Sequence, residues 1–274
     1  MTEKNEEKTL QYIALTLMEQ FGPVRQNLLL NICGDIDWLF TSQEKELITM
    51  AAEYTKCHTD VELIREFVRQ RDNAEIRKRA EEIWEASQKA EISMITKEDI
   101  AYPQRFRNLD GIPVLLYAKG NLRINDYKAS TGIIGARRCS REGRDKAIEI
   151  TKTANVDGKA VIRGMAKGID SYAHTAAIKE NGYTIAVLGN GPDICYPSEH
   201  RALYEAIIRN GCILSEYPPG KGPRRYMFPQ RNRLIAGLSD ELYVINAGRH
   251  SGTESTISYC QKYGRKIEVL QRQE

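Results

Sequence analysis

Residues Val161–Pro197 read VIRGMAKGIDSYAHTAAIKENGYTIAVLGNGPDICYP, and this stretch decides the fold. Two apolar runs, which begin at Val161 and Thr184, have the length of buried strands. Between them, alanines at helical spacing predict a helix that Asp170 opens. Apolar runs joined by a helix indicate parallel strands that are covered on both faces of the sheet.

The turn between the first strand and the helix is the first clue to function. Gly164 and Gly168 bracket Lys167, directly before the helix that begins at Asp170. Backbone N–H groups at the carboxyl end of a strand, where a helix starts, attract anions. A turn with two glycines and a lysine therefore favours a phosphate as its ligand.

The same alternation continues through the rest of the chain from residue 92. We expect strands at 114–117, 132–135, 161–163, 184–188, 212–215, 242–245 and 267–270, with helices beginning near Ser140, Asp170, Ser198, Pro229 and Gly252. This pattern predicts an α/β domain with a mainly parallel sheet. Residues 1–91 instead show apolar positions at helical spacing, so we expect a small all-helical accessory domain there and the α/β domain at 92–274.

Composition restricts the class of protein. The 274 residues carry a net charge of only +3, so any basic binding surface must be local. The six cysteines show no CxxC spacing and no zinc-type cluster, which favours reduced thiols in a cytoplasm and predicts neither a metal nor a cofactor. No apolar run is long enough to span a bilayer, so we expect no membrane partner.

Four loops follow strand ends, and a doubly wound sheet brings such loops to one edge. Together with the basic segment 226–236, they supply the candidate phosphate ligands Gly135, Arg137, Arg138, Gly164, Lys167, Gly168, Asp170, Asn190, Phe228, Arg231, Asn232, Arg233, Ser251, Gly252 and Thr256. Each feature also has a structural interpretation, since glycines can serve chain geometry and arginines can be surface charges. The joint pattern favours phosphate binding, and Phe228 could stack on a base.

Several motifs, in this order, resemble the DprA/Smf family of DNA-processing proteins. They are IGARRCSREG, RGMAKGIDSYAH, GYTIAVLGNGPDICYP, FPQRNRLIAGLS and SGTEST, all within residues 92–270. The resemblance implies an extended Rossmann-like fold with helices on both faces of the sheet. It also implies a non-enzymatic cytoplasmic protein that protects single-stranded DNA, loads the RecA recombinase in natural transformation and recombination, and works as a homodimer.

The resemblance also assigns roles by position. Arg137 and Lys167 match the family's basic pocket, and the segment Arg231–Arg233 matches its RNR motif. Ser251, Gly252 and Thr256 match a later loop of the family. Arg163 is a departure, because the family usually has Ser before the glycine turn; its charge near a phosphate site is compatible with binding, and we expect it to contribute.

Two other functions fit part of the pattern. The wider Rossmann-like group includes nucleotide-binding proteins and enzymes that cleave N-glycosidic bonds, such as phosphoribohydrolases, and SGTEST faintly resembles their loop. Against an enzyme, no pair of acids stands at a plausible active-site spacing. A DprA-like module in a defence system, with partner specificity in residues 1–91, is the third hypothesis.

Overall fold

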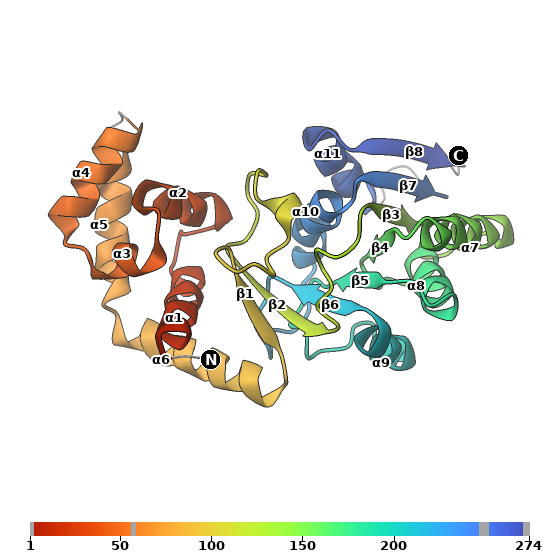
Figure 1. Cartoon of the computed structure of the whole chain (residues 1–274), viewed down its shortest axis with the longest axis horizontal. Coiled ribbons are helices and arrows are strands. Elements are labelled where there is room, and N and C mark those ends of the chain that lie inside the picture. Colours follow the sequence, from red (N-terminus) through yellow and green to blue (C-terminus); the bar gives the residue numbers. More distant parts are fainter. Residues whose placement is uncertain (1–2, 56–58, 247–251, 271–274) are drawn as a thin grey trace. The chain divides into compact units, whose positions relative to one another are not determined.

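The computed structural model describes residues 3–55, 59–246 and 252–270 of the chain. They belong to two compact units, one of residues 1–90 with 110–115 and one of residues 91–109 with 116–274 (Figure 1). The first unit is helical, and the second is built around a β-sheet.

The first unit contains α1 (Glu3–Leu17), α2 (Pro23–Cys33), α3 (Ile36–Thr41), α4 (Glu44–Thr55), α5 (Thr59–Arg71) and α6 (Ala74–Lys89). Asp35 caps α3 and Asn73 caps α6, because each side chain accepts a hydrogen bond from a first-turn backbone N–H. In the core, the ring of Phe67 packs edge-on against Phe21 and Phe40, with ring centroids 6.2 and 5.4 Å away. The all-helical character expected of the N-terminal region is confirmed.

The second unit contains one eight-stranded sheet in the order β1-β2-β6-β5-β4-β3-β7-β8. Its strands are β1 (Ser93–Thr96), β2 (Leu115–Gly120), β3 (Ser130–Gly135), β4 (Ala160–Arg163), β5 (Thr184–Val187), β6 (Cys212–Ser215), β7 (Glu241–Ile245) and β8 (Lys266–Leu270). All pairs from β6 to β8 are parallel, and β2 runs antiparallel to β6. The mainly parallel α/β fold is therefore confirmed.

Helices cover both faces of this sheet. The unit has α7 (Arg141–Val156), α8 (Ile169–Lys179), α9 (Arg201–Asn210), α10 (Met227–Leu238) and α11 (Glu254–Lys262), with short 3₁₀ turns η1 (Gln104–Phe106) and η2 (Ser198–His200). On β3, Ile133 packs with Ala147 of α7 and Ala173 of α8. A Cβ on the preceding Gly132 would lie 2.4 Å from the hydroxyl of Ser239, at the end of α10. Since successive strand residues point to opposite faces, α7 and α8 lie on one face and α10 on the other.

Two features of the described chain were not predicted. Strand β1 (Ser93–Thr96) has only two apolar residues, which is too few to show an alternation. The next strand, β2, pairs with β6 in the antiparallel direction, and no local sequence pattern indicates this direction. Within the described residues, no helix is both long and apolar enough to cross a membrane.

Candidate nucleic-acid interface

The carboxyl edge of the sheet brings three of the predicted loops together. Strand β4 lies between β3 and β5, and all three run parallel, so their following loops are neighbours. The loop after β3 touches the turn after β4: the N–H of Ile169 donates to the carbonyl of Ala136 at 3.3 Å. A Cβ on Gly168 would lie 2.3 Å from that same carbonyl, and Gly168 has φ +76°. Only glycine suits this position, because it combines a left-handed backbone with contact between two loops.

Asp170 closes the glycine turn, which we define as residues 164–168. Its Oδ2 accepts hydrogen bonds from the N–H groups of Gly164 at 3.1 Å and Ala166 at 3.3 Å. The N–H groups of Lys167 and Gly168 donate to no acceptor in the part of the chain that the structure describes. The turn therefore presents free donors directly before α8, where the helix dipole also favours an anion.

Exposed cations lie on the glycine turn and on the loop that contacts it. Arg137 and Arg138 are exposed, and neither forms an ion pair with any described residue. The ammonium of Lys167 lies 2.7 Å from Oε1 of Glu199, and both side chains are more than half exposed. An exposed pair of this kind contributes little to stability, so a phosphate can displace Glu199 from Lys167.

Arg231, on α10, supports the glycine turn from within the protein. Its Nη1 donates to the carbonyl of Gly164 at 3.0 Å and also to that of Val187, while Nε donates to Oδ1 of Asn232 at 3.1 Å. A Cβ on Gly164 would lie 2.5 Å from Nη2 of this arginine, so the glycine leaves room for the guanidinium. Burial lowers the pKa of Arg231 to about 10, and the residue stays charged at neutral pH. Its bonds join the ends of β4 and β5 to α10.

The other residues of the RNR motif also have protein partners. The guanidinium of Arg233 forms a bidentate ion pair with Glu216, and its Nη1 lies 2.7 Å from Oε1 of that acid. Asn232 donates to the carbonyl of Gly252 at 3.1 Å and to the hydroxyl of Ser255 at 2.8 Å. The motif therefore fixes α10 against the loop before α11.

Arg163 occupies the end of β4 with no exposed surface. Its Nη1 lies 3.6 Å from Oδ1 of Asp170, and none of its nitrogens has a hydrogen-bond partner among the described residues. Burial lowers its pKa to about 9. No part of this side chain is exposed to a phosphate, so the expected direct contribution of Arg163 is corrected: the structure places the guanidinium inside the protein, against Asp170.

His174, on α8, is buried in the same region. The hydroxyl of Thr184 donates to the carbonyl of Val161 at 2.8 Å, so it accepts from Nδ1 of His174, also at 2.8 Å. In the neutral ring, Nε2 of His174 therefore carries no proton, and this nitrogen has no hydrogen-bond partner among the described residues. Burial, with the neighbouring charge of Arg163, holds the pKa of His174 well below its usual 6.5.

Some of the remaining candidate residues are buried and hold a loop in place, and others lie at the surface. Buried Asn190 donates to the carbonyls of Gly191 at 2.9 Å and Ile194 at 2.7 Å, which fixes the loop after β5. Half-buried Phe228 packs against Tyr196, whose ring is 45% exposed, with ring centroids 5.5 Å apart. Thr256 is buried and Gly135 is partly buried, whereas Gly252 is exposed; Ser251 lies outside the described residues.

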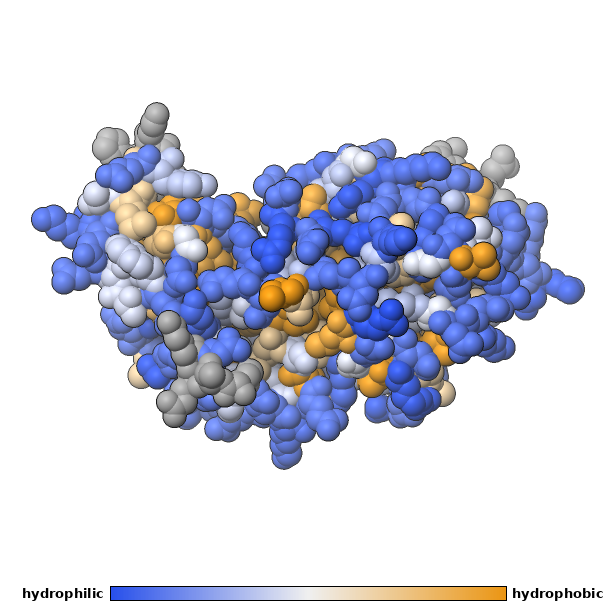
Figure 2. All heavy atoms as spheres, in the orientation of Figure 1, coloured by the Kyte–Doolittle hydropathy of each residue, from blue (hydrophilic) through white to orange (hydrophobic). Residues whose placement is uncertain are grey.

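Two arginines that were not predicted precede Phe228 in the sequence. Arg224 and Arg225 are exposed in the loop before α10, without an ion pair to any described residue, and Tyr226 after them is 53% exposed. The signal was present in the sequence, because the two arginines follow the turn-forming PPGKGP segment and precede two aromatic residues. Figure 2 shows that hydrophilic residues dominate the visible face and that its apolar patches are small and separate.

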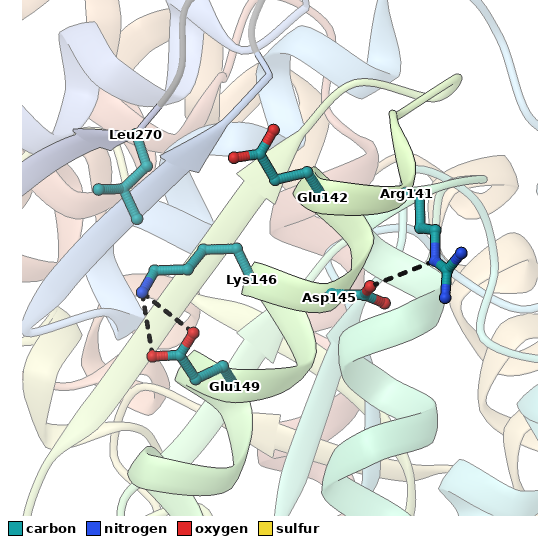
Figure 3. A pocket seen from close by; sticks show the side chains of 6 residues that line it. All are labelled: Arg141, Glu142, Asp145, Lys146, Glu149 and Leu270. Atoms are coloured by element: carbon teal, nitrogen blue, oxygen red, sulfur yellow. Dashed lines mark hydrogen bonds and ion pairs between the residues drawn. The ribbon is translucent and has the colours of Figure 1, made fainter.

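A pocket elsewhere in the unit has a different character. Between α7 and β8 it is lined by Arg141, Glu142, Asp145, Lys146, Glu149 and Leu270 (Figure 3). Its cations already face acids: Lys146 lies 3.0 Å from Glu149, and Arg141 lies 3.9 Å from Asp145. Three acids against two cations give this pocket no preference for a phosphate. No predicted site residue lines it.

Comparison with known proteins gives a consistent result. The family model described as DNA recombination-mediator protein A matches residues 93–274. Protein Smf of Synechocystis is 37% identical over 186 residues, which are 67% of this chain and 47% of that protein. DNA processing protein DprA of Streptococcus pneumoniae is 37% identical over 169 residues, which are 62% of this chain and 59% of that protein. The chain thus spans about half the length of the curated relatives that it matches.

Two solved structures share the fold. The X-ray structure of DprA from Streptococcus pneumoniae matches with a TM-score of 0.77 and 26% sequence identity. The matched region is 96% of this chain and 87% of the Streptococcus chain. A structure of DprA from Helicobacter pylori, determined to explain its binding of single-stranded DNA, has a TM-score of 0.61 at 30% identity. That comparison covers 66% of this chain and 81% of the other.

Proposed function

This chain belongs to the family of DNA recombination-mediator protein A, and on that premise we propose that it binds single-stranded DNA at the glycine turn. The observation that carries the proposal is a pair of exposed cations, Arg137 and Arg138, on the loop that contacts the glycine turn, together with the N–H groups of Lys167 and Gly168; among the described residues, these cations have no ion-pair partner and these N–H groups have no acceptor. Cations and backbone donors together hold phosphates without reading the sequence of the strand.

The direct ligands in this proposal are surface groups. Arg137, Arg138 and Lys167 neutralise phosphates, and the N–H groups of the glycine turn donate to the same oxygens. Phe228 and its neighbour Tyr196 offer aromatic faces on which a base can stack. Arg224 and Arg225 extend the cationic surface beyond these rings.

A second set of residues shapes the site. Asp170 closes the turn, Arg163 and Arg231 lie beneath it, and Arg233 is neutralised by Glu216. Arg163 and Arg231 with the one carboxylate of Asp170 leave a net positive charge beneath the turn, which adds to the field at the surface although these residues do not touch the strand.

The biological role is proposed at the level of the family. A protein that holds single strands through their backbone can protect them and hand them to a recombinase, and the family description names recombination mediation. We extend this role to RecA loading in the cytoplasm during recombination or natural transformation, with a homodimer as the working form. A binding protein of this kind needs no catalytic step.

One experiment separates this function from an enzymatic one. Labelled oligo-dT is titrated against the protein, and nucleoside monophosphates are incubated with it while free base is assayed. We expect saturable binding of oligo-dT and no release of base. Release of base at a rate proportional to protein concentration, without binding of oligo-dT, would overturn the proposal in favour of an N-glycosidic enzyme.

A further inference from the structure

An exposed tyrosine and an arginine form a small surface one helical turn beyond the glycine turn. Tyr172 of α8 is 39% exposed, and the guanidinium carbon of Arg144, on α7, lies 6.0 Å from the centre of its ring. We call this pair, Arg144 and Tyr172, the shelf. An aromatic ring of this size at the surface is free to take a further partner on its exposed part.

The shelf is continuous with the proposed phosphate site. The N–H of Tyr172 donates to the carbonyl of Gly168 at 3.1 Å, so the tyrosine follows the glycine turn by a single helical turn, about 5 Å. On the other side, Ser140 caps α7 by accepting from the N–H of Gly143 at 3.0 Å. This cap connects the loop that carries Arg137 to the helix that carries Arg144.

The charge of this surface favours an anion. Residues 137–145 contain four arginines and two acids, so this segment keeps a net positive charge. Arg144 itself is partly neutralised, because its Nε and Nη2 donate to Oδ1 of Asp145 at 2.9 and 2.8 Å. Asp145 therefore competes with any phosphate that approaches Arg144.

We propose that the shelf receives the next part of a single strand as it leaves the glycine turn, with a base stacked on Tyr172 and its phosphate beside Arg144. This inference rests on the proposed function and adds a second contact region to it. An aromatic face beside a guanidinium suits a single strand, because its bases are unstacked and accessible, whereas a duplex hides them. The shelf thus predicts a longer binding site than the glycine turn alone supplies.

Oligonucleotides of two lengths test the inference. The dinucleotide d(TpT), held by its one phosphate at the glycine turn, is the short strand, and oligo-dT of about 15 nucleotides, which continues past the turn onto the shelf, is the long strand. Tyr172→Ala should weaken binding of the long strand about tenfold, the scale of one lost base–aromatic stack, and leave the short strand unchanged. Tyr172→Phe should bind both lengths like wild type, since the ring is kept. Lys179→Ala, at the far end of the same helix, is the matched control and should change neither.

Replacing Asp145 should change the affinity for the long strand in the opposite direction. Asp145→Asn removes the acid that competes for Arg144, so it should bind the long strand more tightly, whereas Arg144→Ala should bind it more weakly with a shallower salt dependence. Wild-type affinity for both lengths in Tyr172→Ala and Arg144→Ala would overturn the shelf. Equal weakening at both lengths would also overturn it, since the residues would then belong to the primary site. A wild-type protein that binds neither length would contradict the proposed function itself.

Discussion

At the scale of single residues, cations at the glycine turn have two different roles. Lys167 is more than half exposed, and its ion-pair partner in the described part of the chain is an exposed acid, Glu199. Arg231 is 5% exposed and bonds to backbone carbonyls of Gly164 and Val187. A ligand can bind Lys167 without disturbing the fold. Replacing Arg231 would instead remove the hydrogen bonds to the carbonyls of Gly164 and Val187, at the ends of two central strands.

The first prediction concerns Lys167. Lys167→Ala should weaken binding of oligo-dT by about 1–2 kcal/mol, the scale of a charge-assisted hydrogen bond, and lower the salt slope by about 0.7. Its thermal unfolding temperature should stay that of wild type, because an exposed ion pair adds little stability. Fluorescence anisotropy over a salt series provides the measurement.

Two further variants control this result. Glu199→Gln frees Lys167 from its partner and should strengthen binding, and Lys262→Ala, at the end of α11, should do nothing. Wild-type affinity and slope in Lys167→Ala would show that the glycine turn is only a structural corner.

The second prediction concerns His174 and pH. The folded protein holds its pKa well below 6.5, because the ring is buried near Arg163, His200 and Arg231. Below pH 6.5 the unfolded chain therefore binds a proton that the folded chain does not, and the free energy of unfolding falls as pH falls. The loss should approach about 1.4 kcal/mol per pH unit until the folded pKa is reached.

Urea denaturation between pH 7.5 and 5 measures this loss. His174→Gln keeps a donor for the hydroxyl of Thr184 and cannot titrate, so its stability should depend less on pH than that of wild type. A wild-type stability that is flat over this range would contradict the buried, neutral assignment of His174.

At the scale of elements, the loop before α10 supplies charge that the helix itself does not. On the helix, Arg231 bonds to backbone carbonyls and Arg233 pairs with Glu216. In the loop, Arg224 and Arg225 are exposed and form no ion pair with a described residue. The double variant Arg224→Ala/Arg225→Ala should bind oligo-dT more weakly, with a salt slope lower by about 1.4. The pair Lys179→Ala/Lys262→Ala removes the same charge elsewhere and should keep the wild-type slope. Equal slopes in both double variants would exclude the loop from the interface.

The order of strands and helices from β2 onward was predictable, because most buried strands contain an apolar run and the helices have apolar positions at their own period. The ion pair between Arg233 and Glu216 was not predictable from the sequence. Glu216 lies seventeen positions before Arg233, and the two side chains meet only because α10 packs beside the end of β6. The burial of Arg163 was also beyond local reasoning, because a charged residue at a strand end is normally exposed, and here the side chain lies against Asp170 of α8, which packs on β4.

The loops that meet at the sheet edge were predictable for a different reason. Parallel strands place their carboxyl ends together whatever their order, so Gly135, Gly164 and Asn190 were expected at one edge. Which of their side chains face solvent depends on packing between loops, such as the contact of Gly168 with the carbonyl of Ala136. The sequence therefore predicted which loops meet at this edge, but not which of their side chains are exposed.

At the scale of the whole molecule, assembly is a separate prediction. We expect a homodimer on family grounds, so light scattering at tens of micromolar should report twice the mass of one chain, with dissociation on dilution if the interface is weak. The salt dependence of oligo-dT binding should not change with dimer content if each glycine turn acts alone. A single-chain mass at every concentration would rule out the dimer without affecting the DNA site.

The central claim is that the carboxyl edge of the sheet binds single strands through their phosphates and bases. The most direct measurement is a titration of wild-type protein with labelled oligo-dT and with a matched duplex, each at several salt concentrations. We predict tighter binding of the single strand, because its bases are open to the exposed rings, and an affinity that falls steeply with salt as counterions are released. Equal affinity for the two DNA forms, or an affinity for oligo-dT that does not change with salt, would contradict the account.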